Sequence, residues 1–255
     1  MRILLIGDIV GKPGRKALEM LLPGIRAEYA IDLVIANGEN AAGGFGITED
    51  TAADIFAAGA AVITTGDHVW DKKEVLPYLG QEPRLLRPLN FPPGAPGRGV
   101  FTRNGVRIVN LMGRVFMKEH VDCPFRAMDA LLKEQPPCPI TIVDFHAEAS
   151  SEKQALGWYL DGRVTAVVGT HTHVPTADPR LLPKGTAFVT DLGMAGAYNS
   201  VIGDDPQEVL FRFLTQMPKA LSPAKGPLRL CSVLVDVDEA TGRARDIQRI
   251  DRVVE

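Results

Sequence analysis

"GDIVGKPGR" (residues 7–15) follows the first apolar run of the chain. Its glycines and its lysine raise the question of whether this loop binds phosphate or whether Asp8 binds a metal ion. A Walker-type phosphate loop needs four residues between its two glycines and a Ser or Thr directly after its lysine. Here Gly7 and Gly11 enclose only three residues, and a proline follows Lys12. The alternative is that Asp8, at the end of a strand, holds a metal ion. The residues that follow the other strands decide between the two.

Short apolar runs alternate with helical patterns along the chain, which predicts an α/β fold. The segment 87–99 is rich in proline and glycine and predicts an irregular surface connection. Near the end of the sequence, "RLCSVLVDVD" (229–238) and "GRARDIQRIDRV" (242–253) are expected to pair as antiparallel edge strands. The other strands are expected at 3–6, 33–36, 62–65, 106–111, 140–143, 164–168 and 186–190, and helices near 15–28, 49–58 and 206–217, the last capped by Asp205.

Length and composition favour one large domain spanning residues 1–255, because 45% of the residues are hydrophobic and no composition shift divides the chain. The formal net charge of -3 does not indicate a nucleic-acid-binding surface. The three cysteines form no C-x-x-C pair, which favours a reducing compartment. No apolar stretch has membrane-spanning length, so we expect a cytoplasmic protein with no membrane partner.

Polar residues able to bind metals follow five of the predicted strands. Ligands of open α/β sheets bind beyond the carboxyl ends of the strands, so these positions are the ones to compare. Four of the five histidines lie there, whereas His120, in "MKEH", is assigned no role. The residues are Asp8 after the first strand, Glu39 and Asn40 after the second, Asp67 and His68 after the third, Asp144, His146 and Glu148 in "DFHAE", and His171 and His173 in "GTHTH".

Each of these residues alone has a structural explanation, because carboxylates cap helices and asparagines form turns. The H-x-H pair is more specific, since residues two apart in an extended segment point the same way. Seven of them together offer carboxylate, amide and imidazole groups and no thiolate: Asp8, Glu39, Asn40, Asp67, His146, His171 and His173. They exceed the ligands of one tetrahedral zinc ion and suit two adjacent ions that share a carboxylate. Such ligands are compatible with Fe, Mn or Zn.

In this order the motifs resemble those of the calcineurin-like metallophosphoesterases, from residue 1 to about residue 196. "GDIVGKPGR", "NGENAAGG" (37–44) and "DFHAE" (144–148) are similar to the YmdB-type 2′,3′-cyclic-nucleotide phosphodiesterase subgroup. Two positions depart from the general family pattern: Val10 stands where a histidine is usual, and Asp67 where an asparagine is usual. The carboxylate at position 67 adds negative charge and affects which metals are held.

The resemblance implies a four-layer αββα sandwich with two mixed β-sheets, and a tendency to form homo-oligomers. It implies that the substrates are small phosphodiesters, namely 2′,3′-cyclic nucleotides such as 2′,3′-cAMP. It also implies that a hydroxide bridging two metal ions hydrolyses these substrates. Iron is the expected metal, with Mn or Zn as alternatives. His68 is the expected general acid. The implied ligands are Asp8, Glu39, Asn40 and His173 for one ion and Glu39, Asp67, His146 and His171 for the other, with Glu39 bridging and Asn40 replacing the missing histidine.

Other functions are compatible with the same residues. The same centre could serve a broader phosphomonoesterase or phosphoprotein phosphatase, and a degraded centre could serve a non-catalytic, metal-dependent nucleotide sensor or RNA-associated regulator. A Rossmann-type dinucleotide site is disfavoured, since no G-x-G-x-x-G follows the first strand. His68 has the alternative role of a hydrogen-bonding neighbour of the ligands, and Lys12 that of a solvated loop residue.

Overall fold

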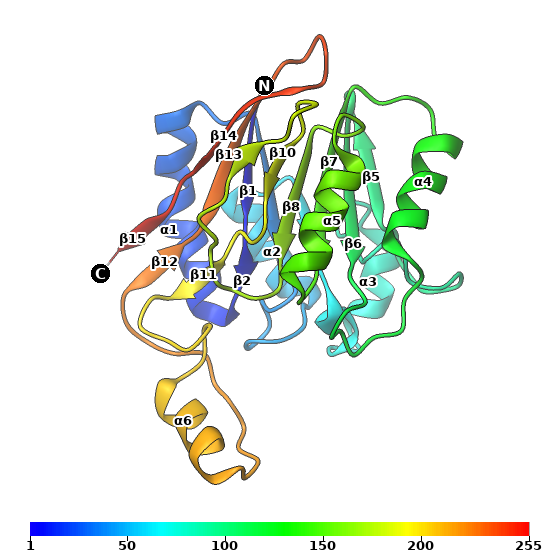
Figure 1. Ribbon diagram of the computed structural model, residues 1–255. Helices are drawn as coiled ribbons and strands as arrows, with labels where there is room; N and C mark the ends of the chain where they lie inside the picture. The colour runs from blue at the N-terminus through cyan, green and yellow to red at the C-terminus, as the bar shows by residue number, and fades with distance from the viewer. Residues whose placement is uncertain (255) are drawn as a thin grey trace.

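The computed structural model describes residues 1–254 as a mixed α/β fold, which confirms the predicted class (Figure 1). Its described strands form three sheets rather than the two expected. The five-stranded sheet has the order β14 (Ala244–Arg249), β13 (Ser232–Val237), β1 (Arg2–Ile6), β3 (Leu33–Asn37), β4 (Val62–Thr64). The six-stranded sheet has the order β5 (Val100–Arg103), β6 (Val106–Met112), β7 (Ile140–His146), β8 (Ala166–Thr170), β10 (Ala187–Val189), β9 (Arg180–Leu181). The third has the order β15 (Arg252–Val254), β12 (Leu228–Leu230), β11 (Met194–Ala197), β2 (Asp8–Ile9).

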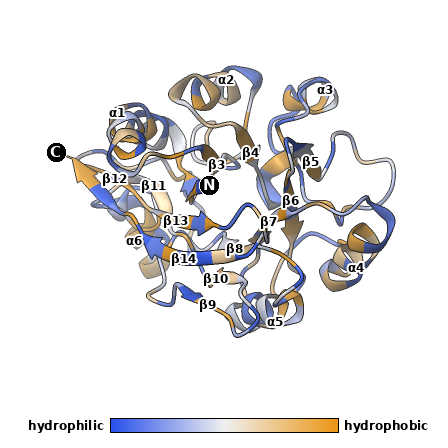
Figure 2. Cartoon of the chain, turned by 90° about the horizontal axis from the view of Figure 1, so that it is seen from above, coloured by the Kyte–Doolittle hydropathy of each residue, from blue (hydrophilic) through white to orange (hydrophobic). Residues whose placement is uncertain are grey.

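Helices cover the outer faces of the two larger sheets (Figure 2). Side chains of α1 and α2 join the outer face of the five-stranded sheet in one apolar cluster, and those of α4 and α5 join the outer face of the six-stranded sheet in another. A third cluster fills the space between the two sheets. The helices are α1 (Gly11–Tyr29), α2 (Glu49–Ala58), α3 (Val75–Gln81), α4 (Pro124–Glu134), α5 (Ser150–Leu160) and α6 (Pro206–Thr215), with a short 3-10 helix, η1 (Asp67–Trp70).

Strand β1 shows why the central strands are continuous apolar runs. Leu4 and Ile6 pack toward the helices, whereas Ile3 and Leu5 pack toward the other sheet. Because successive side chains of a strand point to opposite faces, a strand buried on both faces needs apolar residues at every position. In the two large sheets, β1 runs parallel with β3 and β4, and β6 with β7, β8 and β10, whereas β13 pairs antiparallel with β1.

The predicted elements agree best with the structure where local signals are strong. Helix α2 has the predicted bounds, because Thr48 forms a capping box at its start and Gly59 ends it in a left-handed conformation. Helix α6 begins after Asp205, whose carboxylate accepts hydrogen bonds from two backbone N–H groups, as predicted. The described segment 87–99 contains no helix and no named strand, which also agrees with the prediction.

The structure differs most from the predicted elements at α1 and in the segment 229–238, and α3, α4 and α5 lie outside the predicted helices. Helix α1 begins at Gly11 rather than near residue 15. Pro13 is tolerated in the first helical turn, because the backbone N–H groups of that turn have no acceptor within the helix and a proline there loses no hydrogen bond. The segment 229–238 divides into β12 and β13, and β13 lies between β14 and β1. The sequence predicts both β13 and β14 as edge strands, but only β14 lies at an edge of the sheet. The two strands pair antiparallel, as predicted.

Helix α6 projects from the body of the molecule (Figure 1). It leaves large apolar side chains in solvent, including Phe213 at 73% exposure and Leu214 at 82%. A search of the helices within residues 1–254 finds none with the length and apolar character needed to span a bilayer.

Candidate metal centre

The structure brings together the residues that follow the parallel strands of both large sheets. Asp8 opens β2 directly after β1, and the Glu39–Asn40 pair follows β3. Asp67 begins η1 after β4, while His146 is the last residue of β7. His171 and His173 lie in the loop after β8. These seven residues, far apart in the sequence, meet where the two sheets end, as the sequence predicts.

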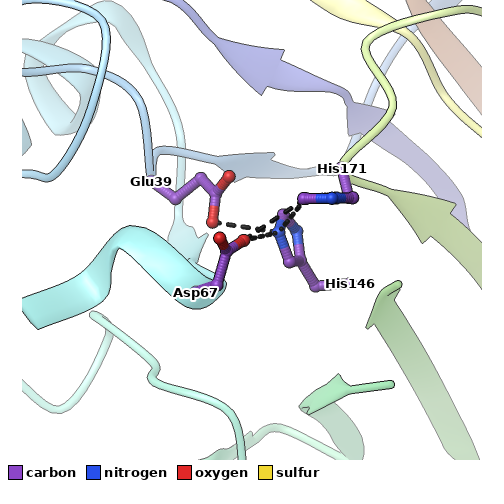
Figure 3. A group of neighbouring side chains, drawn as sticks. All are labelled: Glu39, Asp67, His146 and His171. Atoms are coloured by element: carbon purple, nitrogen blue, oxygen red, sulfur yellow. Dashed lines mark hydrogen bonds and ion pairs between the residues drawn. The ribbon is translucent and has the colours of Figure 1, made fainter. Parts of the chain in front are cut away.

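Glu39, Asp67, His146 and His171 form the first group that could hold a metal ion. One ligand atom from each lies within 4.8 Å of the others. His146 Nε2 is 2.9 Å from Asp67 Oδ1, 3.1 Å from Glu39 Oε2 and 3.0 Å from His171 Nδ1. Figure 3 shows the two carboxylates facing the two imidazoles. Two nitrogen and two oxygen ligands around one point are a suitable set for a transition-metal ion.

Asp8, Glu39 and His173 form the second group, again with ligand atoms within 4.8 Å of one another. Glu39 therefore belongs to both groups. Asn40 lies at the edge of the second group, with its side-chain nitrogen 3.0 Å from His173 Nε2 and 2.9 Å from Glu39 Oε1. The oxygen and nitrogen of an amide exchange places by a simple rotation, so Asn40 can also turn its oxygen to this position.

Burial of the carboxylates makes a cation a fitting occupant. Asp8 and Glu39 are at most 1% exposed. Within residues 1–254, Asp8 Oδ1 and Glu39 Oε2 are buried without a hydrogen bond. Burial raises the pKa of Asp8 to about 8. Burial also acts to lower the pKa of His146, but the carboxylates of Glu39, Asp67 and Asp8 outweigh it, so this pKa is raised well above its usual value. A bound cation would satisfy the unpaired oxygens.

The two histidines of "GTHTH" do not lie in an extended segment. His171 has φ 103° and His173 has φ 63°, both in the left-handed region that non-glycine residues rarely adopt. The expectation that an extended backbone aims both imidazoles the same way is therefore wrong. The strained turn instead divides them, with His171 in the first group and His173 in the second. Each such conformation costs about 1–3 kcal/mol and persists only where surrounding contacts hold it.

His68 lies beside the two groups and belongs to neither. Its Nδ1 is 2.8 Å from Asp71 Oδ2, and its side chain is 39% exposed. Burial acts to lower the pKa of His68, but Glu39, Asp67 and Asp71 raise it overall. A cavity of about 360 Å³ opens over the centre, and its lining includes Glu39, Asn40, His68, His171 and His173.

Lys12 lies away from this cavity. It lines a separate surface groove with residues of α1 and α2, and its side chain is exposed. The structure therefore agrees better with Lys12 as a solvated surface residue than with a role of Lys12 in phosphate binding. Val10 is buried and lines the cavity, where it packs near Gly203.

A buried polar network lies behind the first group, and the sequence analysis assigned it no role. Asp144, on β7, accepts hydrogen bonds from Asn37, Thr64 and Thr170, which come from β3, β4 and β8. Asn37 in turn accepts the backbone N–H of Glu39 at 3.0 Å. The signal for this network was an aspartate within an apolar strand, "ITIVDFH" (140–146), where only a satisfied carboxylate is tolerated.

Comparison with known proteins finds relatives that match nearly the whole chain. The chain is 47% identical, over 98% of its length and 96% of the relative's, to a 2′,3′-cyclic-nucleotide 2′-phosphodiesterase of Bacillus subtilis (strain 168). It is 36% identical, over all of its length and 94% of the relative's, to a putative phosphatase/phosphodiesterase of Mycoplasma genitalium.

Two solved structures share the fold over the whole chain. A hypothetical protein from Thermus thermophilus superposes with a TM-score of 0.93 at 44% identity, with all of both chains covered. A structure described as a novel phosphatase from Mycoplasma pneumoniae superposes with a TM-score of 0.94 at 35% identity, and 94% of that chain is covered. A family model described as YmdB-like protein matches residues 4–250. The chain therefore belongs to the YmdB-like protein family.

Proposed function

We propose that this protein is a metal-dependent phosphodiesterase that hydrolyses 2′,3′-cyclic nucleotides. The observation that carries the proposal is Glu39, a buried carboxylate shared by two groups of potential metal ligands. A shared carboxylate suits two adjacent cations, which are a common device for phosphoryl transfer. The Bacillus subtilis relative, named for this activity, matches nearly all of the chain.

The residues of the centre would hold two ions. When bound, two such cations lower the pKa of a shared water and neutralise the phosphoryl oxygens as charge develops. We propose iron for both positions, with manganese or zinc as alternatives, because oxygen and imidazole ligands suit all three. Asp8, Glu39, Asn40 and His173 would hold one ion, and Glu39, Asp67, His146 and His171 the other.

His68 is the proposed general acid. In the hydrolysis, the oxygen of a water molecule adds to phosphorus, one P–O bond to the ribose breaks, and the freed ribose oxygen takes a proton from His68 Nε2. The proton that the attacking water gives up replaces, through solvent, the one that His68 has donated. Asp71 accepts the hydrogen bond from Nδ1 and orients the ring. His68 also lines the cavity over the centre, within reach of a bound phosphodiester.

Phe45 favours a nucleotide over a smaller phosphoester. Its ring is 46% exposed and its centroid lies 6.4 Å from that of His68. Lys72 Nζ lies over the ring, 4.3 Å from the centroid, and fixes its orientation. An exposed aromatic ring beside the reaction centre offers a stacking surface for a nucleobase.

The test is turnover of 2′,3′-cAMP by protein loaded in turn with Fe²⁺, Mn²⁺ and Zn²⁺. We expect hydrolysis to a nucleoside monophosphate, and much slower hydrolysis of 3′-AMP and of simple aryl phosphates. Faster hydrolysis of the phosphomonoesters would overturn the assigned substrate. Binding of 2′,3′-cAMP by metal-loaded protein without turnover would instead identify a sensor.

We also propose that the layers correspond to an αββα sandwich, since one apolar cluster lies between the two large sheets and one beneath each outer helical layer. A homo-oligomer is supported by the apolar side chains of α6 in solvent, among them Phe213 and Leu214. Light scattering on the intact chain tests this, and replacement of both residues by Ser should reduce the measured mass. A monomeric wild type would contradict the proposal.

A further inference from the structure

A buried ion pair lies beneath the metal centre, outside both groups of potential ligands. Lys153 Nζ, from α5, donates to Asp191 Oδ2 at 2.7 Å, and both side chains are 1% exposed. Asp191 follows β10. Burying two charges is costly and is compensated only where further hydrogen bonds satisfy them. The other contacts of Asp191 therefore indicate what the pair does.

One oxygen of Asp191 holds the strained turn of the histidines. Its Oδ2 accepts the Thr172 backbone N–H at 3.2 Å and the Thr172 hydroxyl at 2.8 Å. Thr172 stands between His171 and His173, the two residues with left-handed backbone conformations. Both hydrogen bonds therefore act at the centre of a turn that would otherwise relax.

The other oxygen of Asp191 is linked to Asp8 through two hydrogen bonds of the Gly193 backbone. Oδ1 accepts the Gly193 N–H at 2.8 Å, and the Gly193 carbonyl accepts the Asp8 N–H at 3.1 Å. A Cβ at Gly7 would lie 1.9 Å from that carbonyl oxygen, so only glycine allows the two segments to approach. The His171 N–H then donates to Asp8 Oδ2 at 3.1 Å and closes the ring of contacts.

His146, in the first group, is positioned by a separate set of contacts. Its Nδ1 lies 3.0 Å from the Thr170 hydroxyl, which donates to Asp144 Oδ1 at 2.7 Å. These residues share no hydrogen bond with Asp191 among those formed within residues 1–254. His146 thus has a support of its own, whereas His171, the other histidine of the first group, shares the Asp191-held turn with His173.

We infer that Lys153 and Asp191 are positioning residues that hold Asp8 and His173 toward Glu39 and so support the second metal position more strongly than the first, where only His171 depends on them. The inference rests on the proposed two-ion centre. Lys153 anchors the Asp191 carboxylate, and that carboxylate fixes Thr172 on one side and Gly193 on the other. Groups that orient metal ligands in this way typically contribute about 10–100-fold to metal affinity.

The test uses Thr172→Val, which removes the hydroxyl donor to Asp191 while keeping the backbone donor and the size of the side chain. Thr190→Val is the matched control, because the Thr190 hydroxyl makes the same kind of bond to a carboxylate, Asp178 Oδ2 at 2.5 Å, in the same region. Thr172→Ser restores the hydroxyl. Each metal-stripped full-length variant is titrated with Mn²⁺ by calorimetry. The spin coupling between the two bound Mn²⁺ ions is followed by electron paramagnetic resonance.

We expect Thr172→Val to weaken one Mn²⁺ site by about 10–100-fold, weaken the other less and diminish the signal of the coupled pair. Thr172→Ser should restore the affinity, and Thr190→Val should keep both sites. Equal Mn²⁺ affinities in Thr172→Val and Thr190→Val, or equal weakening of both sites, would overturn the inference. If the wild type binds one Mn²⁺ ion, the two-ion proposal is wrong, and the positioning role then requires that this ion bind more weakly to Thr172→Val than to Thr190→Val.

Discussion

The Thr170 hydroxyl lies 3.0 Å from His146 Nδ1 and fixes the tautomer of that imidazole. The hydroxyl has one proton, which it donates to Asp144. Toward His146 it therefore acts as an acceptor, and the ring carries a proton on Nδ1. With a metal ion bound, Nε2, the nitrogen that faces Asp67 and Glu39, would then supply the lone pair. This is the tautomer that a metal ligand needs.

Replacing Thr170 with Val should therefore lower metal affinity without altering any ligand. The isosteric change leaves His146 Nδ1 without its acceptor, and the loss of such a contact typically costs about 10–100-fold in affinity. Calorimetric titration of the metal-stripped variant with Mn²⁺ measures the effect, and Thr170→Ser is the control. Wild-type affinity in Thr170→Val would show that ring orientation does not depend on this hydroxyl.

His68→Ala should separate proton transfer from metal binding. Because His68 belongs to neither ligand group, the variant should retain its metal content. Its kcat for 2′,3′-cAMP should fall by about 10²–10⁴, the usual contribution of a general acid. Metal analysis and steady-state kinetics on the same preparation give both quantities. Unchanged kcat would remove the assigned role, and lost metal would make His68 a support of the ligands.

Phe45→Leu should raise KM for 2′,3′-cAMP while leaving the chemistry intact. Stacking of one base on an aromatic ring contributes about 1–3 kcal/mol, which corresponds to a 5-fold to 150-fold weaker complex. A cyclic phosphodiester without a base, glycerol 1,2-cyclic phosphate, is the comparison substrate. Its KM should be the same in wild type and variant. Equal increases for both substrates would mean that Phe45 shapes the cavity rather than contacts the base.

The sequence predicts the fold and the candidate site best where a local pattern of residues is enough to place an element. Apolar runs followed by polar residues locate the strand ends, and Asp8, Glu39 and His146 lie together because parallel strands end on the same side. Short strands such as β2 and β9 have two residues each, too few for any periodic pattern to reveal. They form only because neighbouring strands offer hydrogen-bonding partners.

The supporting residues could not be predicted in the same way. Lys153 lies in a helical segment where a lysine usually faces solvent, and nothing local indicates that it is buried against Asp191. Their pairing joins α5 to the segment after β10, so it depends on the packing of the whole sheet. The strained conformation of His171 likewise follows from tertiary contacts, because an extended backbone is the local preference.

Asp178, which belongs to neither group of potential metal ligands, gives the free energy of unfolding a pH dependence. Burial acts to raise its pKa, but hydrogen bonds from Thr176 and Thr190 lower it overall. A carboxyl group with a lower pKa in the folded state stabilises the fold above its unfolded pKa of about 3.9, and this contribution is lost as the pH falls toward the folded value.

Asp178→Asn should consequently destabilise the protein by about 1–2 kcal/mol at pH 7, since the amide accepts these hydrogen bonds less strongly than the carboxylate. The difference in unfolding free energy between wild type and variant should shrink below about pH 4, where the wild-type carboxyl group begins to take up its proton. Urea denaturation of both proteins at pH 7 and near pH 3 measures it. A difference that stays constant between the two pH values would show that the ionised form of Asp178 does not support the fold.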